Sequence, residues 1–172
     1  MIYTGIGSRK TPDNVLTVMS DIALYLVEKD YTLRSGGAKG ADSAFGQFAC
    51  KKEIYLPWDG FQGHKADGIS YIVPEYNESI VFKYHPKPSR LTESGFKLMS
   101  RNANQVLGRN TKNPILSEFI IAWTADGGFS GGTGFALRLA YANNIPILNL
   151  YDKNILLNWK KFVNIEIYGD KC

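Results

Sequence analysis

A glycine-rich turn between a short apolar strand and a helix constrains this chain more than any other segment. The turn, Ser35 to Asp42, follows a predicted strand at 31–34 and precedes a predicted helix at 41–50. Three of its first six residues are glycine. Glycine permits positive φ, which lets successive N–H groups converge at the positive end of the following helix. The turn is therefore either a tight connection in an α/β fold or part of an anion-binding site.

Strands and helices alternate along the rest of the chain. The first helix is expected to have Thr11 as its N-cap and Pro12 at its first position. Strands are predicted at 2–6, 53–56, 118–123 and 145–150, and further helices at 78–83, 91–107 and 135–141. Glycine and proline break the pattern between 58 and 88, where we otherwise expect loops. This order predicts a Rossmann-like, doubly wound, mostly parallel sheet with helices on both faces, in one domain spanning residues 1–172.

The composition is that of an ordinary globular protein, with 44% hydrophobic and 21% charged residues. No apolar run approaches the length of a membrane span, and the N-terminus has no signal-peptide pattern. Cys50 and Cys172 are too few for a disulfide framework. We therefore expect a cytoplasmic protein without membrane partners.

Positive charge is concentrated in one segment. The net charge is +4, but residues 83–112 carry +6, with seven basic residues and the single acid Glu93. Such a segment suits a polyanionic partner, although it is also compatible with a solvated helix face. Residues 83–112 are therefore a candidate surface for single-stranded DNA.

Two further glycine-rich loops follow predicted strands, one at Gly7-Ser8-Arg9 and one at 126–134. Loops that follow parallel strands meet at the carboxyl edge of the sheet, where ligands bind in this fold class. Arg9 adds a charge suited to bidentate contact with phosphate. The three loops together predict a cleft for a nucleotide-type small molecule.

Several familiar sites are not supported. Lys10 occupies the third glycine position of a dinucleotide fingerprint, and no P-loop pattern occurs. His64 and His85 have no metal-ligand spacing, and Ser130 misses the register of a nucleophile elbow. We therefore expect no metal, no cofactor and no covalent catalyst.

Four motifs resemble the SLOG superfamily, and most closely the Rossmann core of the DprA/Smf family. They are Gly-Ser-Arg-x-x-Thr-Pro at 7–12, Ser-Gly-Gly-Ala-x-Gly-Ala-Asp at 35–42, Ser-Arg-Asn at 100–102 and Ser-Gly-Gly-Thr at 130–133. The resemblance implies an extended Rossmann fold, in which Arg101 and Asn102 close the cleft from a helix. The 172 residues are expected to leave no room for the family's flanking domains. The middle segment with Trp58-Asp59-Gly60-Phe61 is unlike the bacterial core and is similar to short single-domain versions found in phage genomes. A phage-encoded protein would act in the host cytoplasm.

The motifs and the three loops together assign the ligand-binding residues. They are Gly7, Ser8, Arg9, Ser35, Gly36, Gly37, Ala38, Gly40, Asp42, Arg101, Asn102, Gly131, Gly132 and Thr133. Backbone amides of the glycines would hold phosphate, and the two arginines would neutralise its charge. Trp58, Phe61 and Phe129 are candidates for stacking on a base, and each is equally suited to a core.

Two further branches of the superfamily suggest other activities. Nucleoside monophosphate N-glycosidases of the LOG group place a glutamate after the third loop, and this chain has no acid there. The remaining candidates for a catalytic carboxylate are Asp42, Glu93 and Asp126. Another branch senses NAD-derived or cyclic nucleotide signals in antiviral defence. We therefore expect a homo-oligomeric protein that binds such a ligand without turnover and sequesters a host defence signal. DprA-like DNA processing and LOG-like hydrolysis are the alternatives.

Overall fold

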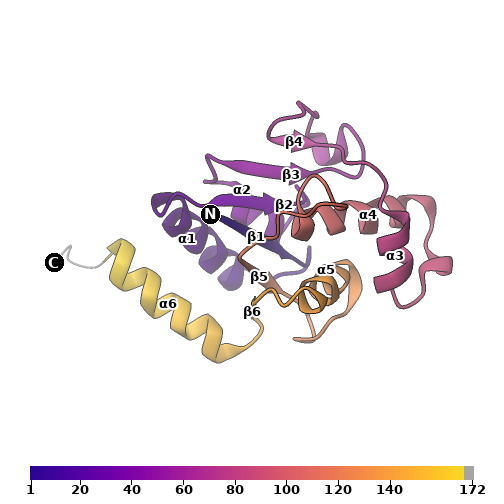
Figure 1. Ribbon diagram of the computed structural model, residues 1–172. Helices are drawn as coiled ribbons and strands as arrows, with labels where there is room; N and C mark the ends of the chain where they lie inside the picture. Colours follow the sequence, from indigo (N-terminus) through magenta and orange to yellow (C-terminus); the bar gives the residue numbers. More distant parts are fainter. Residues whose placement is uncertain (169–172) are drawn as a thin grey trace.

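Six parallel strands form one sheet in the computed structural model, which describes residues 1–168. The strands are β1 (Ile2–Gly7), β2 (Thr32–Ser35), β3 (Lys52–Tyr55), β4 (Tyr71–Ile72), β5 (Phe119–Trp123) and β6 (Ile147–Asn149). Their order across the sheet is β4-β3-β2-β1-β5-β6 (Figure 1). β1 pairs with β2 on one side and with β5 on the other. The winding direction therefore reverses beside β1, the place where α/β sheets bind ligands.

Helices cover both faces of this sheet, so the expected doubly wound arrangement is confirmed. One hydrophobic cluster joins the sheet to α1 (Asp13–Glu28), α2 (Ala41–Gly46) and α6 (Lys153–Tyr168). The other joins it to α3 (Glu78–Tyr84), α4 (Glu93–Leu107) and α5 (Gly131–Ala142). Short 3₁₀ turns lie at Phe61–Gly63 and Pro88–Arg90.

The alternation of side chains along the central strands explains the two cores. Tyr3 and Ile121 point to the α1 side, whereas Ile6 and Ile120 point to the α4–α5 side. All four are at most 3% exposed. A parallel sheet covered on both faces needs such continuous apolar strands.

The start of α1 differs from the sequence expectation. Its N-cap is Pro12, in an extended conformation, and not Thr11. The Thr11 hydroxyl instead donates to the carbonyl of Ser8 at 2.7 Å, which ties the residue to the loop after β1. This loop contact outweighs a helix cap that a local sequence pattern favoured.

Several boundaries also differ. α2 ends at Gly46 and not at 50, consistent with the low helix propensity of glycine. β6 covers only Ile147–Asn149 of the predicted 145–150. β4 lies in the segment that was expected to contain loops. The sequence did not predict this strand, because two residues are too few to show an alternating pattern.

α6 has no counterpart in the sequence prediction. Its residues Ile155, Leu156 and Trp159 pack against the α1-side core, and Figure 1 shows the helix extending from the end of the sheet beside α1. Among the described residues no helix could span a membrane. Cys50 is exposed and free, and Cys172 lies outside the described residues.

Candidate functional site

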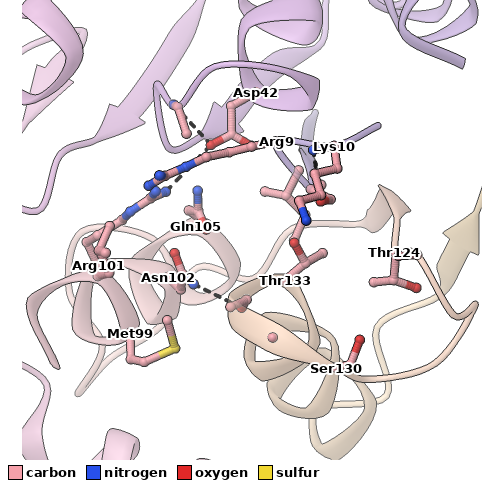
Figure 2. Close-up of a pocket in the computed structure, with 18 residues that line it drawn as sticks. Arg9, Lys10, Asp42, Met99, Arg101, Asn102, Gln105, Thr124, Ser130 and Thr133 are labelled. Atoms are coloured by element: carbon pink, nitrogen blue, oxygen red, sulfur yellow. Dashed lines mark hydrogen bonds and ion pairs between the residues drawn. The ribbon is translucent and has the colours of Figure 1, made fainter. Parts of the chain in front are cut away.

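Three loops at the carboxyl edge of the sheet and one face of α4 enclose a cavity of about 410 Å³ (Figure 2). Small-molecule sites typically measure about 300–1,000 Å³. Ten of the predicted ligand-binding residues line it: Gly7, Ser8, Arg9, Ala38, Asp42, Arg101, Asn102, Gly131, Gly132 and Thr133. The cavity lies where the winding of the sheet reverses.

The loop after β1 is held against its neighbours on both sides. The amide of Ser8 donates to the carbonyl of Trp123 at the end of β5, at 3.2 Å. On the other side, a Cβ on Gly40 would lie 2.9 Å from the Ser8 carbonyl oxygen and 3.0 Å from Cα of Arg9. Gly40 also has φ +87°, which a residue with a side chain rarely adopts. This glycine therefore lets the first two loops touch, and the exposed side chains of Arg9 and Lys10 remain at the cavity.

Amide side chains of α4 connect the second loop to the third. With its amide oriented as its neighbours require, Gln105 accepts a hydrogen bond from the amide of Gly36 at 2.8 Å and donates to Oδ1 of Asn102 at 3.1 Å. Asn102 in turn donates through Nδ2 to the carbonyl of Gly132 at 3.0 Å. This relay of hydrogen bonds, from Gly36 through Gln105 and Asn102 to Gly132, fixes the loop after β2 relative to the start of α5. Sequence reasoning missed Gln105, although its spacing of one helical turn from Arg101 places it on the same face of α4.

Arg101 is the buried cation of the cavity. Its Nη1 lies 3.8 Å from Oδ2 of Asp42, and its guanidinium lies 5.8 Å from the centre of the Phe61 ring. Nη1 also donates a hydrogen bond to the side-chain oxygen of Gln105. The Nε–H group is buried and has no hydrogen-bond partner among the described residues. A buried donor without a partner is costly.

Asp42 is the single carboxylate among the described residues that line the cavity. It is 5% exposed, and its Oδ2 accepts a hydrogen bond from the amide of Ala38 at 3.2 Å. Burial raises the pKa of Asp42, while the charge of Arg101 acts in the opposite direction. The carboxylate thus braces the glycine loop and faces the buried arginine.

The first turn of α5 forms the floor of the cavity. Ser130 is its N-cap, but the Ser130 side chain makes no capping hydrogen bond. Ser130, Gly131, Gly132 and Thr133 all line the cavity, and Figure 2 places Ser130 and Thr133 on this turn. The start of a twelve-residue helix therefore presents its positive dipole end toward Arg101, from the opposite wall.

Four predicted residues do not line the cavity. The Ser35 hydroxyl is buried and donates to the carbonyl of Gly5 at 2.6 Å, which joins β2 to β1. Gly36 lies against Arg101 and gives its amide to Gln105. Gly37 packs toward β3, near Ile54, and Gly40 forms the loop contact described above. The second loop therefore supports the wall, and Ala38 and Asp42 reach the cavity.

Neither of the other two candidate carboxylates reaches this cavity. Glu93 is exposed on the first turn of α4 and pairs with Lys97 at 2.7 Å. Asp126 is exposed and accepts a hydrogen bond from the amide of Gly128 at 3.0 Å. Both roles are local, because each acid lies in a first turn or a loop where such contacts form readily.

The three aromatic candidates also lie outside the main cavity. Phe129 is exposed and contacts Tyr141, with ring centres 6.2 Å apart. Phe61 is buried beneath Arg101, and Trp58 lies beside it at the surface. These three rings are therefore not placed to stack on a base in the main cavity.

The basic segment 83–112 does not form one uniform surface. Arg101 is buried, Lys97 pairs with Glu93, and Arg109 donates to the carbonyl of Gly68 at 2.9 Å and also to that of Ile69. Arg109 is exposed despite these contacts, and the other exposed cations are Lys83, Lys87, Arg90 and Lys112. Tertiary contacts therefore hold Arg101 and Arg109, and a local helical pair holds Lys97.

No family model and no curated protein matches the chain. The fold as a whole does match a solved structure. The fold resembles DNA processing protein A. The structure of that protein from Helicobacter pylori, described for its single-stranded DNA binding mode, superposes with a TM-score of 0.60 at 16% sequence identity. The match covers 98% of this chain and 80% of that one. The DprA-like fold that the four motifs suggested is thereby confirmed.

Proposed function

We propose that this protein binds a nucleotide or nucleotide-derived ligand in the cavity without catalysing its breakdown. The observation that carries the proposal is the buried Arg101 guanidinium, whose Nε–H lacks a partner among the described residues. Arg101 lines the cavity together with Arg9 and the first turn of α5. Two guanidinium groups and a helix N-terminus in one cavity favour a phosphorylated ligand.

Calorimetry with a panel of mono-, di-, cyclic and NAD-derived nucleotides tests this proposal. Arg9→Gln is the most informative variant, because Arg9 is exposed and its removal leaves the core intact. We expect it to weaken binding about tenfold, as for a hydrogen bond to a charged group. Arg90→Gln, at an exposed arginine outside the cavity, is the matched control and should bind like the wild type.

The ligand should be recovered intact after incubation. Release of a free base would instead favour LOG-like hydrolysis, with Asp42 as the carboxylate within reach. No saturable binding to any member of the panel would contradict the proposal.

A second candidate function is binding of single-stranded DNA. Its support is the fold shared with a DNA-binding protein and the exposed cations of the 83–112 segment. Such binding depends on phosphate neutralisation and therefore weakens steeply with salt, whereas binding in an enclosed cavity does so less. The salt dependence separates the two functions.

A further inference from the structure

Arg101 also lines a second, smaller cavity of about 220 Å³. This volume is below the usual range for a whole ligand, but it can hold one group of a larger one. The aromatic and charged side chains that line it are Trp58, Asp59, Tyr76, Lys97 and Arg101. Arg101 therefore lines both cavities.

Two large aromatic side chains of this cavity are exposed but held in place. Trp58 is 38% exposed, and its ring packs edge-on against Phe61 with centres 5.3 Å apart. Phe61 itself lies beneath the Arg101 guanidinium. Tyr76 is 59% exposed and contacts Phe96, with ring centres 6.5 Å apart. Ordered, exposed aromatic rings beside a buried guanidinium are the usual components of a stacking site for a base.

We propose that this second cavity binds the base of the ligand whose phosphate contacts Arg101 in the main cavity, an inference that rests on the proposed function. Trp58 and Tyr76 supply the stacking faces. Asp59, whose carboxylate also accepts from the amide of Ala66 at 2.7 Å, supplies an acceptor for an N–H group at the edge of the base. Lys97 is held by Glu93 and frames the cavity. The base comes either from a free nucleotide or from a DNA strand, since both present the same planar group on a phosphate.

Calorimetry of the double variant Trp58→Ala, Tyr76→Ala tests the assignment. With AMP, GMP, CMP and UMP we expect about a tenfold or greater loss of affinity, the effect of removing base–aromatic stacking. Ribose 5-phosphate, which has no base, should bind the double variant as it binds the wild type. Tyr141→Ala is the matched control, because Tyr141 is 73% exposed on α5 and lies outside both cavities.

A second measurement keeps the assignment testable if the double variant is unstable. Trp58→Phe retains a ring and should retain affinity for nucleotides. Nucleotides should quench the tryptophan fluorescence of the wild type, and this quenching should be absent in the variant. A loss of affinity confined to a single-stranded oligonucleotide would support the cavity with a strand as the source of the base.

If the double variant binds both the nucleotides and the oligonucleotide as the wild type does, the base site is overturned and the proposed function is left standing. If the wild type itself binds none of the nucleotides, the proposed function fails as well. The two failures are therefore distinguishable.

Discussion

At the residue scale, Gly36 determines where the buried arginine can lie. A Cβ at this position would be 1.3 Å from Nη1 of Arg101 and 2.3 Å from the side-chain amide group of Gln105. The φ of Gly36 is not in the left-handed region, so its backbone would accept a side chain without strain. The absence of a side chain therefore serves the packing of Arg101 and not the conformation of the turn.

Gly36→Ala should displace Arg101 and weaken nucleotide binding about tenfold or more, because hydrogen bonds to a charged group depend on its placement. Gly46→Ala is the matched control, since a Cβ there meets nothing within 4 Å. Calorimetry measures affinity, and thermal melting verifies that both variants fold. Wild-type affinity in Gly36→Ala would contradict the role assigned to Arg101.

At the scale of elements, a charged network ties β2, β3 and the segment after α4 together. Nε of Arg34 lies 2.7 Å from Oε2 of Glu53, which also accepts from the Tyr55 hydroxyl at 2.9 Å. Nε of Arg109 lies 3.4 Å from Oε1 of the same carboxylate. Burial raises the pKa of Glu53, but Arg34, Tyr55 and Arg109 more than offset it, so the pKa falls below the ordinary 4.5. The carboxylate therefore stabilises the folded state in its charged form.

Glu53→Gln should lower the free energy of unfolding at pH 7 by about 1–3 kcal/mol, because the buried Nε–H group of Arg34 loses its charged acceptor. Since the pKa of Glu53 is lowered on folding, its contribution is present above pH 4.5 and is lost as the pH falls through the lowered value. Wild-type stability should thus decline below pH 4.5, and the variant should decline less. Denaturant unfolding from pH 7 to pH 3 measures both.

Glu93→Gln is the control for this network, because Glu93 pairs with Lys97 on the exposed face of α4. Its stability at pH 7 should differ little from that of the wild type. Equal stability of Glu53→Gln and wild type at pH 7 would contradict the stabilising role of the network.

At the scale of the whole molecule, the distribution of positive charge decides between the two candidate functions. Lys83, Lys87, Arg90 and Lys112 remain exposed after folding. Changing the four to glutamine should reduce affinity for a single-stranded oligonucleotide. It should also reduce the slope of log affinity against log salt concentration, by roughly 0.7 for each phosphate that is no longer neutralised. Nucleotide affinity should stay unchanged, because none of the four lines the main cavity.

Filter binding at several salt concentrations measures the affinity for the oligonucleotide, and calorimetry measures the affinity for the nucleotide. Unchanged DNA affinity in the fourfold variant would exclude this surface as the DNA-binding site.

The fold was predictable because its signals are local and repeated. Buried β1 and β5, the apolar stripe of α1 and the glycine-rich turns each follow from a few adjacent residues. β4 and α6 were missed for opposite reasons. β4 has two residues and no alternation, whereas α6 carries apolar residues at helical spacing, Ile155, Leu156 and Trp159, which the sequence prediction did not use.

Only the part of the candidate site that consists of loops and motifs was predictable from the sequence. The sequence alone determined that three glycine-rich loops follow parallel strands, and the geometry of parallel sheets then brings such loops to one edge. Only the tertiary structure decided which residues face the cavity. In the folded protein, Ser35 and Gly36 support the cavity from behind without lining it. Gln105 joins the hydrogen bonds that connect the second and third loops, and Arg101 is buried and lines two cavities. The physical reason is that side-chain contacts between α4 and the loops join residues that lie far apart in the chain. A pattern of neighbouring residues in the sequence does not predict such contacts.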